Sequence, residues 1–156
     1  GVLGGNLASE QISVKRLQGV RSAMARNGLP FDPARHYVPC RYSMAEGYAA
    51  ARKLLAREPE LTAVFALGDV IAMGAMRAFC DLGRRVPEEI SLVGYDGIEV
   101  GNFAVPRLTT IRQDTALLAE EGVRTLLAAI HYKTPPVYRT IGFELLERES
   151  VRPAGL

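Results

Sequence analysis

The sequence predicts an α/β protein built on a doubly wound parallel sheet, and three observations lead to this prediction. Short apolar segments alternate along the chain with longer segments in which apolar residues recur at helical spacing. Residues 62–67 and 90–95 are almost continuously apolar, which is typical of parallel strands covered on both faces. Helical segments follow the strands as return connections, and this alternation is characteristic of parallel sheets.

The expected elements follow one another in a regular order. Strands are expected at residues 1–4, 36–38, 62–67, 90–95, 108–111 and 141–146, and helices at residues 11–27, from 44 onward, 70–82 and from 115 onward. Gly28 is expected to end the first helix, because a glycine just past the last turn accepts a left-handed backbone. Ser43 and Glu46 have the spacing of a capping box and start the second helix.

The second half of the chain carries further start and stop signals. Asp69 is expected to cap the helix at residues 70–82, which ends at Gly83. Residues 96–107 are expected to be irregular. Asp114 is expected to cap the last helix, and Pro135-Pro136 to break it. The apolar face of that helix, which we expect to be buried, consists of Ala119, Val123, Leu126, Leu127 and Ile130.

Composition is that of one globular domain. The chain has 156 residues, of which 48% are apolar and 23% charged, so it carries no signature of disorder. Its net charge of +2 is too small to indicate nucleic-acid binding. No apolar run approaches the ~18 residues of a membrane span. The opening GVLGG has no initiator Met and no export-signal pattern, and it resembles the middle of a strand. We therefore expect the chain to be part of a longer protein.

Cysteines and histidines predict neither a metal site nor a catalytic centre. Cys40 and Cys80 lie outside any CxxC motif, and neither forms a recognised metal-ligand pattern with a histidine. We therefore expect two reduced structural thiols in a cytoplasmic protein. His36 and His131 are isolated in the sequence and are expected on the surface or in loops. No catalytic residue, metal or cofactor is predicted.

Two carboxylates are expected at one edge of the sheet. Asp69 and Asp96 each stand just past a buried strand, and ligands of such sheets bind outside the carboxyl ends of the strands. Paired carboxylates accept hydrogen bonds from the hydroxyls of a polyol, but they are equally suited to a metal or to acid–base chemistry. Capping of the following helix also accounts for Asp69 without any ligand.

Four segments resemble the effector-binding domain of the lac repressor and galactose repressor family of bacterial transcription regulators. They are TAVFALGD (residues 62–69), AMGA (72–75), VPEEISLVGYD (86–96) and PRLTTIRQ (106–113). The resemblance implies a periplasmic-binding-protein-like fold in which an effector lies between two α/β subdomains. It covers essentially the whole chain but only the second half of that architecture.

The resemblance also implies how the chain is organised. Residues 1–112 match the second subdomain, 113–140 a crossover segment that normally packs on the first subdomain, and 141–156 the final strand and tail. The first subdomain, the helix before residue 1 and the DNA-binding domain are expected to lie outside this chain. We therefore expect exposed apolar surface on the crossover segment and self-association.

Several residues match effector-contacting positions of the family. Arg16 matches an arginine that holds effector hydroxyls, because its guanidinium is a rigid fork of donors. Asp96 matches an acidic contact, Tyr42 an aromatic position suited to the apolar face of a sugar ring, and Gln113 a polar pocket residue. With the residues at the sheet edge, the candidate effector-binding residues are Arg16, Tyr42, Gly68, Asp69, Asp96 and Gln113.

Gly68 departs from the family pattern. Members commonly carry Asn immediately before the aspartate, and that amide contacts effector. Because glycine has no side chain, we expect the pocket to be roomier and poorer in polar partners at this point. The effector is expected to be a sugar or a sugar derivative, but not necessarily the sugar that suits the lac repressor.

The family also forms homodimers through this subdomain. Residues 70–82 and 99–105 are the expected interface, because they carry more large apolar side chains than one core needs. The interface candidates are Met73, Met76, Phe79 and Phe103. Operator DNA is then an indirect partner, bound only by the DNA-binding domain. The alternatives are a periplasmic-type sugar-binding protein of a transport system, which shares the fold, and an enzyme using the two aspartates. No nucleophile elbow or P-loop supports an enzyme.

Overall fold

The computed structural model describes residues 1–133, 135 and 138–153, and it contains one mixed six-stranded sheet. The strands lie in the order β2-β1-β3-β4-β5-β6, with the first five parallel and β6 antiparallel to β5. Their bounds are Val2–Gly4 (β1), Tyr37–Pro39 (β2), Ala63–Ala66 (β3), Ser91–Asp96 (β4), Thr109–Gln113 (β5) and Phe143–Leu146 (β6). The predicted doubly wound α/β fold is confirmed, and β6 alone runs against the parallel direction.

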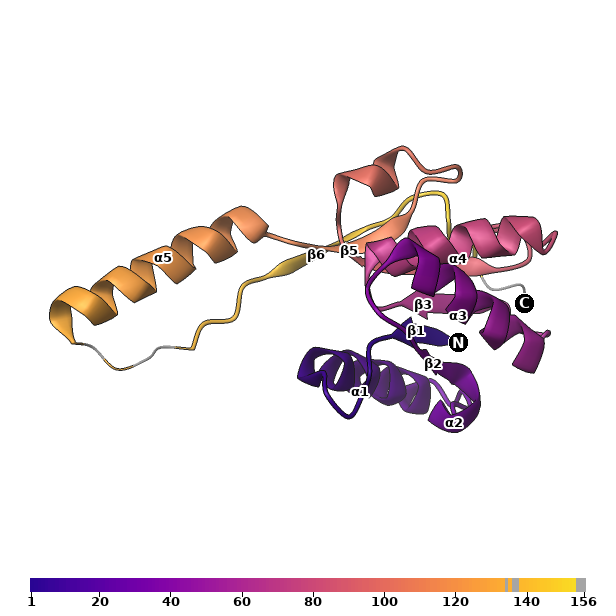
Figure 1. Cartoon of the computed structure of the whole chain (residues 1–156), viewed down its shortest axis with the longest axis horizontal. Helices are drawn as coiled ribbons and strands as arrows, with labels where there is room; N and C mark the ends of the chain where they lie inside the picture. The colour runs from indigo at the N-terminus through magenta and orange to yellow at the C-terminus, as the bar shows by residue number, and fades with distance from the viewer. Residues whose placement is uncertain (134, 136–137, 154–156) are drawn as a thin grey trace.

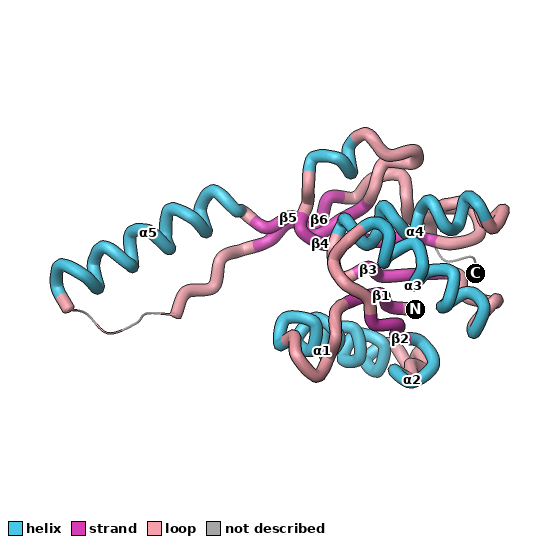
Figure 2. The backbone as a smooth tube through the Cα atoms, viewed as in Figure 1, coloured by secondary structure: helices cyan, strands magenta, loops and turns pink. Residues whose placement is uncertain are grey.

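Helices cover both faces of the sheet (Figures 1 and 2). They are Gln11–Arg26 (α1), Pro33–His36 (α2), Met44–Arg57 (α3), Asp69–Asp81 (α4) and Thr115–Tyr132 (α5), with a 3₁₀ turn at Glu99–Asn102. Alternate strand residues point to opposite faces, so Leu3 and Val64 pack with α3 and α4, whereas Val2 and Phe65 pack with Leu17 of α1. Both layers of the core are therefore built by the short apolar strands that the sequence shows.

The face that α1 covers is left partly open. An open hollow lies beside α1 along β3 and β4, and much of its lining is apolar. Val20, Met24, Phe65, Val93 and Val151 are among the residues that line it. Open apolar surface of this kind on a sheet face normally packs against another element.

Helix α5 stands apart from the other helices at the end of the two strands β5 and β6 (Figure 1). None of its described residues is buried. The apolar face predicted to be buried is instead exposed, because no other element of the described chain packs against it. The exposed large side chains of that helix are Leu117, Leu118, Val123, Leu126, Leu127, Ile130 and Tyr132.

The helix ends match most of the predicted signals. Ser43 accepts a hydrogen bond from the Glu46 amide at the start of α3, and Asp114 accepts one from the Leu117 amide at the start of α5. The prediction that Asp69 caps the next helix is wrong: the N-cap is Gly68, and Asp69 is the first residue of α4. The predicted break at Pro135-Pro136 includes a residue outside the described ones, and α5 ends earlier, at Tyr132.

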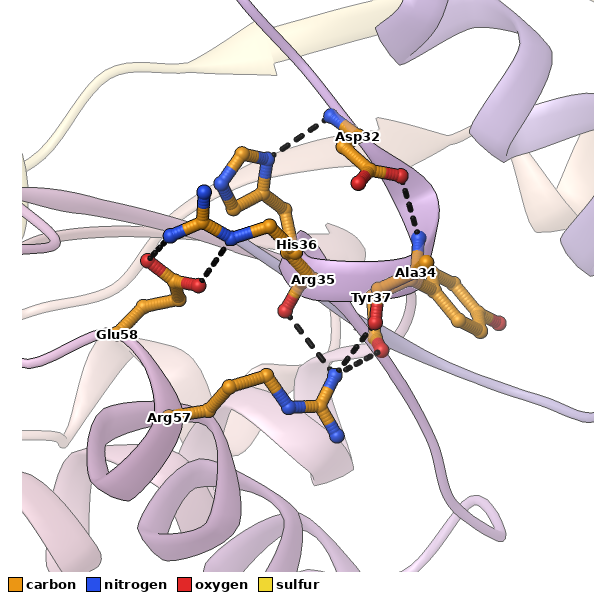
Figure 3. A network of polar contacts seen from close by, with 7 residues as sticks. All are labelled: Asp32, Ala34, Arg35, His36, Tyr37, Arg57 and Glu58. Carbon is orange, nitrogen blue, oxygen red and sulfur yellow. Dashed lines mark hydrogen bonds and ion pairs between the residues drawn. The ribbon is translucent and has the colours of Figure 1, made fainter.

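A short helix, α2, lies between α1 and β2 and is held by a polar network (Figure 3). Asp32 caps it through the Ala34 amide, and the Asp32 amide donates to Nδ1 of His36. The guanidinium of Arg57, at the last position of α3, donates to the carbonyls of Ala34 and Arg35 at 3.0 and 3.1 Å. Arg57 thereby satisfies carbonyls that the end of a short helix leaves without partners.

We predict that Arg57→Ala lowers the free energy of unfolding by about 1 kcal/mol, because two helix-end carbonyls lose a charged donor. Arg35→Ala serves as a matched control, since it removes an exposed ion pair with Glu58 from the same network. Urea denaturation of both variants measures the difference. An equal loss in the two variants would contradict the role assigned to Arg57.

Candidate functional site

The candidate site lies where the order of the sheet reverses. The chain leaves β1 toward β2 on one side and then continues from β3 toward β4 on the other. The segments that follow β1 and β3 therefore diverge at the carboxyl edge of the sheet. A crevice at this switch point is the usual ligand site of doubly wound folds.

Arg16 reaches this point from the second turn of α1. Its Nη1 donates to the Leu67 carbonyl at 2.5 Å, and its Nη2 lies 3.4 Å from the Asp96 carboxylate. The guanidinium carbon lies 3.6 Å from the centre of the Tyr95 ring, a cation–π contact. The side chain is only 12% exposed, so its charge is largely removed from water. Arg16 and Asp96, both predicted from the sequence, thus form one ion pair.

Asp96 is held in place by its backbone and by Gln113. It ends β4 with a φ of 108°, a conformation that few residues other than glycine adopt. Its Oδ1 accepts a hydrogen bond from the Gln113 amide group at 3.0 Å. Burial raises the pKa of the Asp96 carboxyl above its ordinary value, while the charge of Arg16 and the Gln113 hydrogen bond oppose this shift. The structure therefore brings Arg16, Asp96 and Gln113 together.

Asp69 lies below this edge rather than in it. Its side chain is fully buried, and its two oxygens accept hydrogen bonds from the Thr110 hydroxyl at 2.6 Å and the Ile98 amide at 2.8 Å. Burial raises the pKa of the Asp69 carboxyl, and the two hydrogen bonds offset part of this shift. An effector contact through Asp69 would require both bonds to open. Its position instead supports the turn that carries Asp96.

Tyr42 occupies the space beside Gly68. A Cβ atom at residue 68 would lie 2.9 Å from one carbon of the Tyr42 ring and 3.6 Å from Oδ2 of Asp96. The expectation of a roomier pocket at Gly68 is therefore wrong, because the tyrosine ring fills the room that a side chain would take. Tyr42 remains 37% exposed and borders the same space as Asp96.

The structure adds Ser13 to the site, which sequence reasoning missed. Ser13 is fully buried on α1 and lies 3.1 Å from the Tyr42 hydroxyl. Its position three residues before Arg16, on the same helix face, is the only sequence signal that could have indicated it.

The predicted interface residues fall into two groups. Phe79 and Met76 are buried in the core, so the prediction that they form an interface is wrong: their side chains fill the space between α4 and its neighbours. Met73 is partly buried against the core, while Phe103 is 76% exposed. Val105, close to Phe103 in the same loop, is 92% exposed.

Within residues 1–133, 135 and 138–153, no three His, Cys, Asp or Glu side chains come together as metal ligands. Nor does this part of the chain contain a helix whose length and apolar content suit a membrane span. Cys40 is buried and Cys80 exposed, and both are free thiols.

Comparison with known proteins matches this geometry. Residues 1–151 match the periplasmic binding protein-like domain family. The transcriptional regulator CelR of Thermobifida fusca is 39% identical over 88% of this chain and 40% of its own length, and the ribose operon repressor of Haemophilus influenzae is 36% identical over 97% and 45%. A solved structure of the CelR–cellobiose complex is 35% identical to this chain and superposes on it with a TM-score of 0.91. The match covers 96% of this chain and 46% of the CelR chain.

The sheet order and the family match together define a periplasmic-binding-protein-like α/β fold. Over residues 1–151 the chain belongs to the periplasmic binding protein-like domain family, and the relatives and solved structures that it resembles include helix-turn-helix transcriptional regulators and the lac repressor. The chain spans less than half the length of the relatives described above.

The Asp96 carboxyl predicts a pH-dependent cost to stability. When the pKa of an acid is raised in the folded state, its ionisation lowers the stability of the folded protein. Stability is therefore lost as the pH rises from the ordinary pKa of 3.8 through the raised pKa of the folded state. We predict that Asp96→Asn is more stable than the parent protein at pH 7, and that the gap closes toward pH 3.5. Thermal melts of both proteins across this range measure the gap. A gap that widens as the pH falls would contradict the assignment.

Proposed function

We propose that this chain is the second half of an effector-binding domain, which senses a small hydroxyl-rich molecule and controls operator binding by a DNA-binding domain. The observation that carries the proposal is the part-buried cluster of Arg16, Asp96 and Gln113 at the switch point of the sheet. It joins donors and acceptors at the place where ligands bind in this fold.

The chemistry of the cluster suits a polyol. The Asp96 carboxylate accepts hydrogen bonds from hydroxyls, while the amide of Gln113 both donates and accepts. Arg16 adds a fork of donors, and its buried Nε has no hydrogen-bond partner within the described chain. The exposed part of the Tyr42 ring offers a flat apolar surface to a sugar ring. CelR is bound to cellobiose in its solved complex, which supports a sugar as the effector class.

Two uncovered apolar surfaces support the proposed domain limits of 1–112, 113–140 and 141–156. The exposed face of α5 lies in the crossover segment and suits packing against a first subdomain. The hollow beside α1 suits the helix that precedes residue 1 in the family. The effector would then lie between this subdomain and the first one, and it shifts the operator-binding equilibrium by favouring one domain orientation.

A transport-associated sugar-binding protein is the alternative of the same fold. The relatives reported above regulate transcription, and this favours the regulator. A regulator that acts on DNA works in the cytoplasm, and cytoplasmic localisation is therefore part of the proposal.

We predict that Arg16→Ala and Asp96→Ala, made in the full-length protein, each weaken effector response at least tenfold, about 1.4 kcal/mol. Each variant removes a proposed effector contact far from the DNA-binding domain, so operator affinity without effector should change much less. Fluorescence anisotropy with operator DNA measures both quantities, after a thermal-shift series with cellobiose, ribose and related sugars selects the effector. Normal induction of both variants would refute the site.

The dimer interface that we propose is centred on Phe103, Val105 and the part-buried Met73. Phe103 and Val105 are 76% and 92% exposed, an unusual state for large apolar side chains in neighbouring positions. This surface replaces the one predicted from Met76 and Phe79, whose side chains are needed in the core.

We predict that Phe103→Asp shifts the full-length protein toward monomer, because a charge would be buried in an apolar contact. Sedimentation velocity at micromolar concentration measures the shift. Leu29→Asp is the matched control, since Leu29 is 53% exposed at the end of α1, away from this loop. Dissociation of both variants alike, or of neither, would count against the interface.

A further inference from the structure

Ser13 connects the Tyr42 ring to a carboxylate behind the site. Its Oγ lies 3.2 Å from the Gly5 amide, 3.2 Å from Oε2 of Glu10 and 3.1 Å from the Tyr42 hydroxyl. Ser13 is fully buried, so water does not supply alternative partners. Three protein groups therefore share one serine hydroxyl.

The chemistry of these groups fixes the direction of each hydrogen bond. The Gly5 amide only donates, and a carboxylate only accepts. The single hydrogen of Ser13 then points to Oε2 of Glu10, because two oxygens 3.2 Å apart with no hydrogen between them would repel each other. Ser13 consequently has no hydrogen left for Tyr42, and the Tyr42 hydroxyl must donate its own hydrogen to Ser13.

The Tyr42 oxygen then keeps its lone pairs free to accept further hydrogen bonds, and the Tyr42 side chain is part-exposed. The Tyr42 ring borders the same space as Asp96, since a Cβ at Gly68 would touch both. Asp96 is also an acceptor when ionised. An effector that fills this space contacts the Tyr42 ring and the Asp96 carboxylate. If it also reaches the Tyr42 oxygen it meets two acceptors, which suits a group with two hydroxyl hydrogens such as a vicinal diol.

We infer that Glu10 and Ser13 are positioning residues that fix the Tyr42 hydroxyl as a hydrogen-bond acceptor, so that this part of the site selects an effector group that donates. The inference rests on the proposed function. It adds a rule of selectivity, because an effector with a fluorine or ether oxygen at this position cannot donate and is rejected.

Neutron diffraction from crystals of the protein exchanged into D₂O tests the hydrogen-bond directions without any effector. The expected map places the Ser13 deuterium toward Glu10 and the Tyr42 deuterium toward Ser13. A Ser13 deuterium directed at Tyr42 would overturn the inference, whatever sugar the protein binds.

Sugar binding tests the rule of selectivity in the full-length protein. The probes are cellobiose, ribose and their monodeoxyfluoro derivatives, in which fluorine replaces a hydroxyl at nearly the same size but cannot donate. We expect one position at which fluorine weakens binding about tenfold. The ratio of the Kd of the fluorinated sugar to that of the parent sugar should fall close to one in Tyr42→Phe, which lacks the acceptor. In Glu10→Ala the same ratio should fall severalfold, because the freed Ser13 hydrogen allows the tyrosine to donate.

The outcomes separate the inference from the proposed function. Glu60→Ala, at an exposed glutamate away from the site, is the matched control and should keep the parent ratio. A Glu10→Ala variant that keeps the parent ratio, while Tyr42→Phe loses it, would overturn the role of Glu10. If neither sugar binds, the proposed sugar effector fails, and the neutron map still decides the direction of the Tyr42 hydrogen bond.

Discussion

The buried carboxylate of Asp69 is the constraint on which the rest of the site depends. One of its oxygens binds the Thr110 hydroxyl of β5, and the other binds the Ile98 amide just after β4. Through one side chain, the start of α4 is therefore tied to β5 near its first residue and to the turn that follows β4. The same carboxylate explains Gly94, since a Cβ there would lie 2.1 Å from Oδ1 of Asp69. A charge at this depth persists only when fully hydrogen-bonded, so the three elements are fixed together.

The fixed turn places Asp96 where its protein partners compensate its charge only in part. Its φ of 108° is imposed between β4 and the Ile98 amide that Asp69 holds. Burial then raises the pKa of the Asp96 carboxyl, and Arg16 compensates only in part from 3.4 Å. Stored strain and incomplete pairing are typical of binding sites, where a ligand supplies the missing partners. The hydroxyls of a polyol are suitable partners, because they donate to the carboxylate without adding charge.

Sequence patterns were sufficient for the elements and for part of the site. Apolar runs and capping residues predict the strands and helices, because each depends on near neighbours in the chain. The meeting of Arg16, Asp96 and Gln113 followed from the family resemblance and from the rule that ligands bind at carboxyl ends of strands. The sequence could not predict that the Tyr42 ring fills the space that a side chain at residue 68 would occupy. This packing joins elements far apart in sequence, and no local pattern records which side chain fills a given space.

The same limit explains why the sequence predicted both a buried face on α5 and exposed apolar surface on residues 113–140. Helical spacing of apolar residues shows that a face is covered but not what covers it. Gln113 connects this question to the site, since it ends β5, contacts Asp96 and stands two residues before α5 begins. An effector that competes for Asp96 or binds Gln113 therefore acts on the segment that leads to α5. Because an effector shifts an equilibrium only through different affinities for two states, Gln113 is well placed to make those affinities differ.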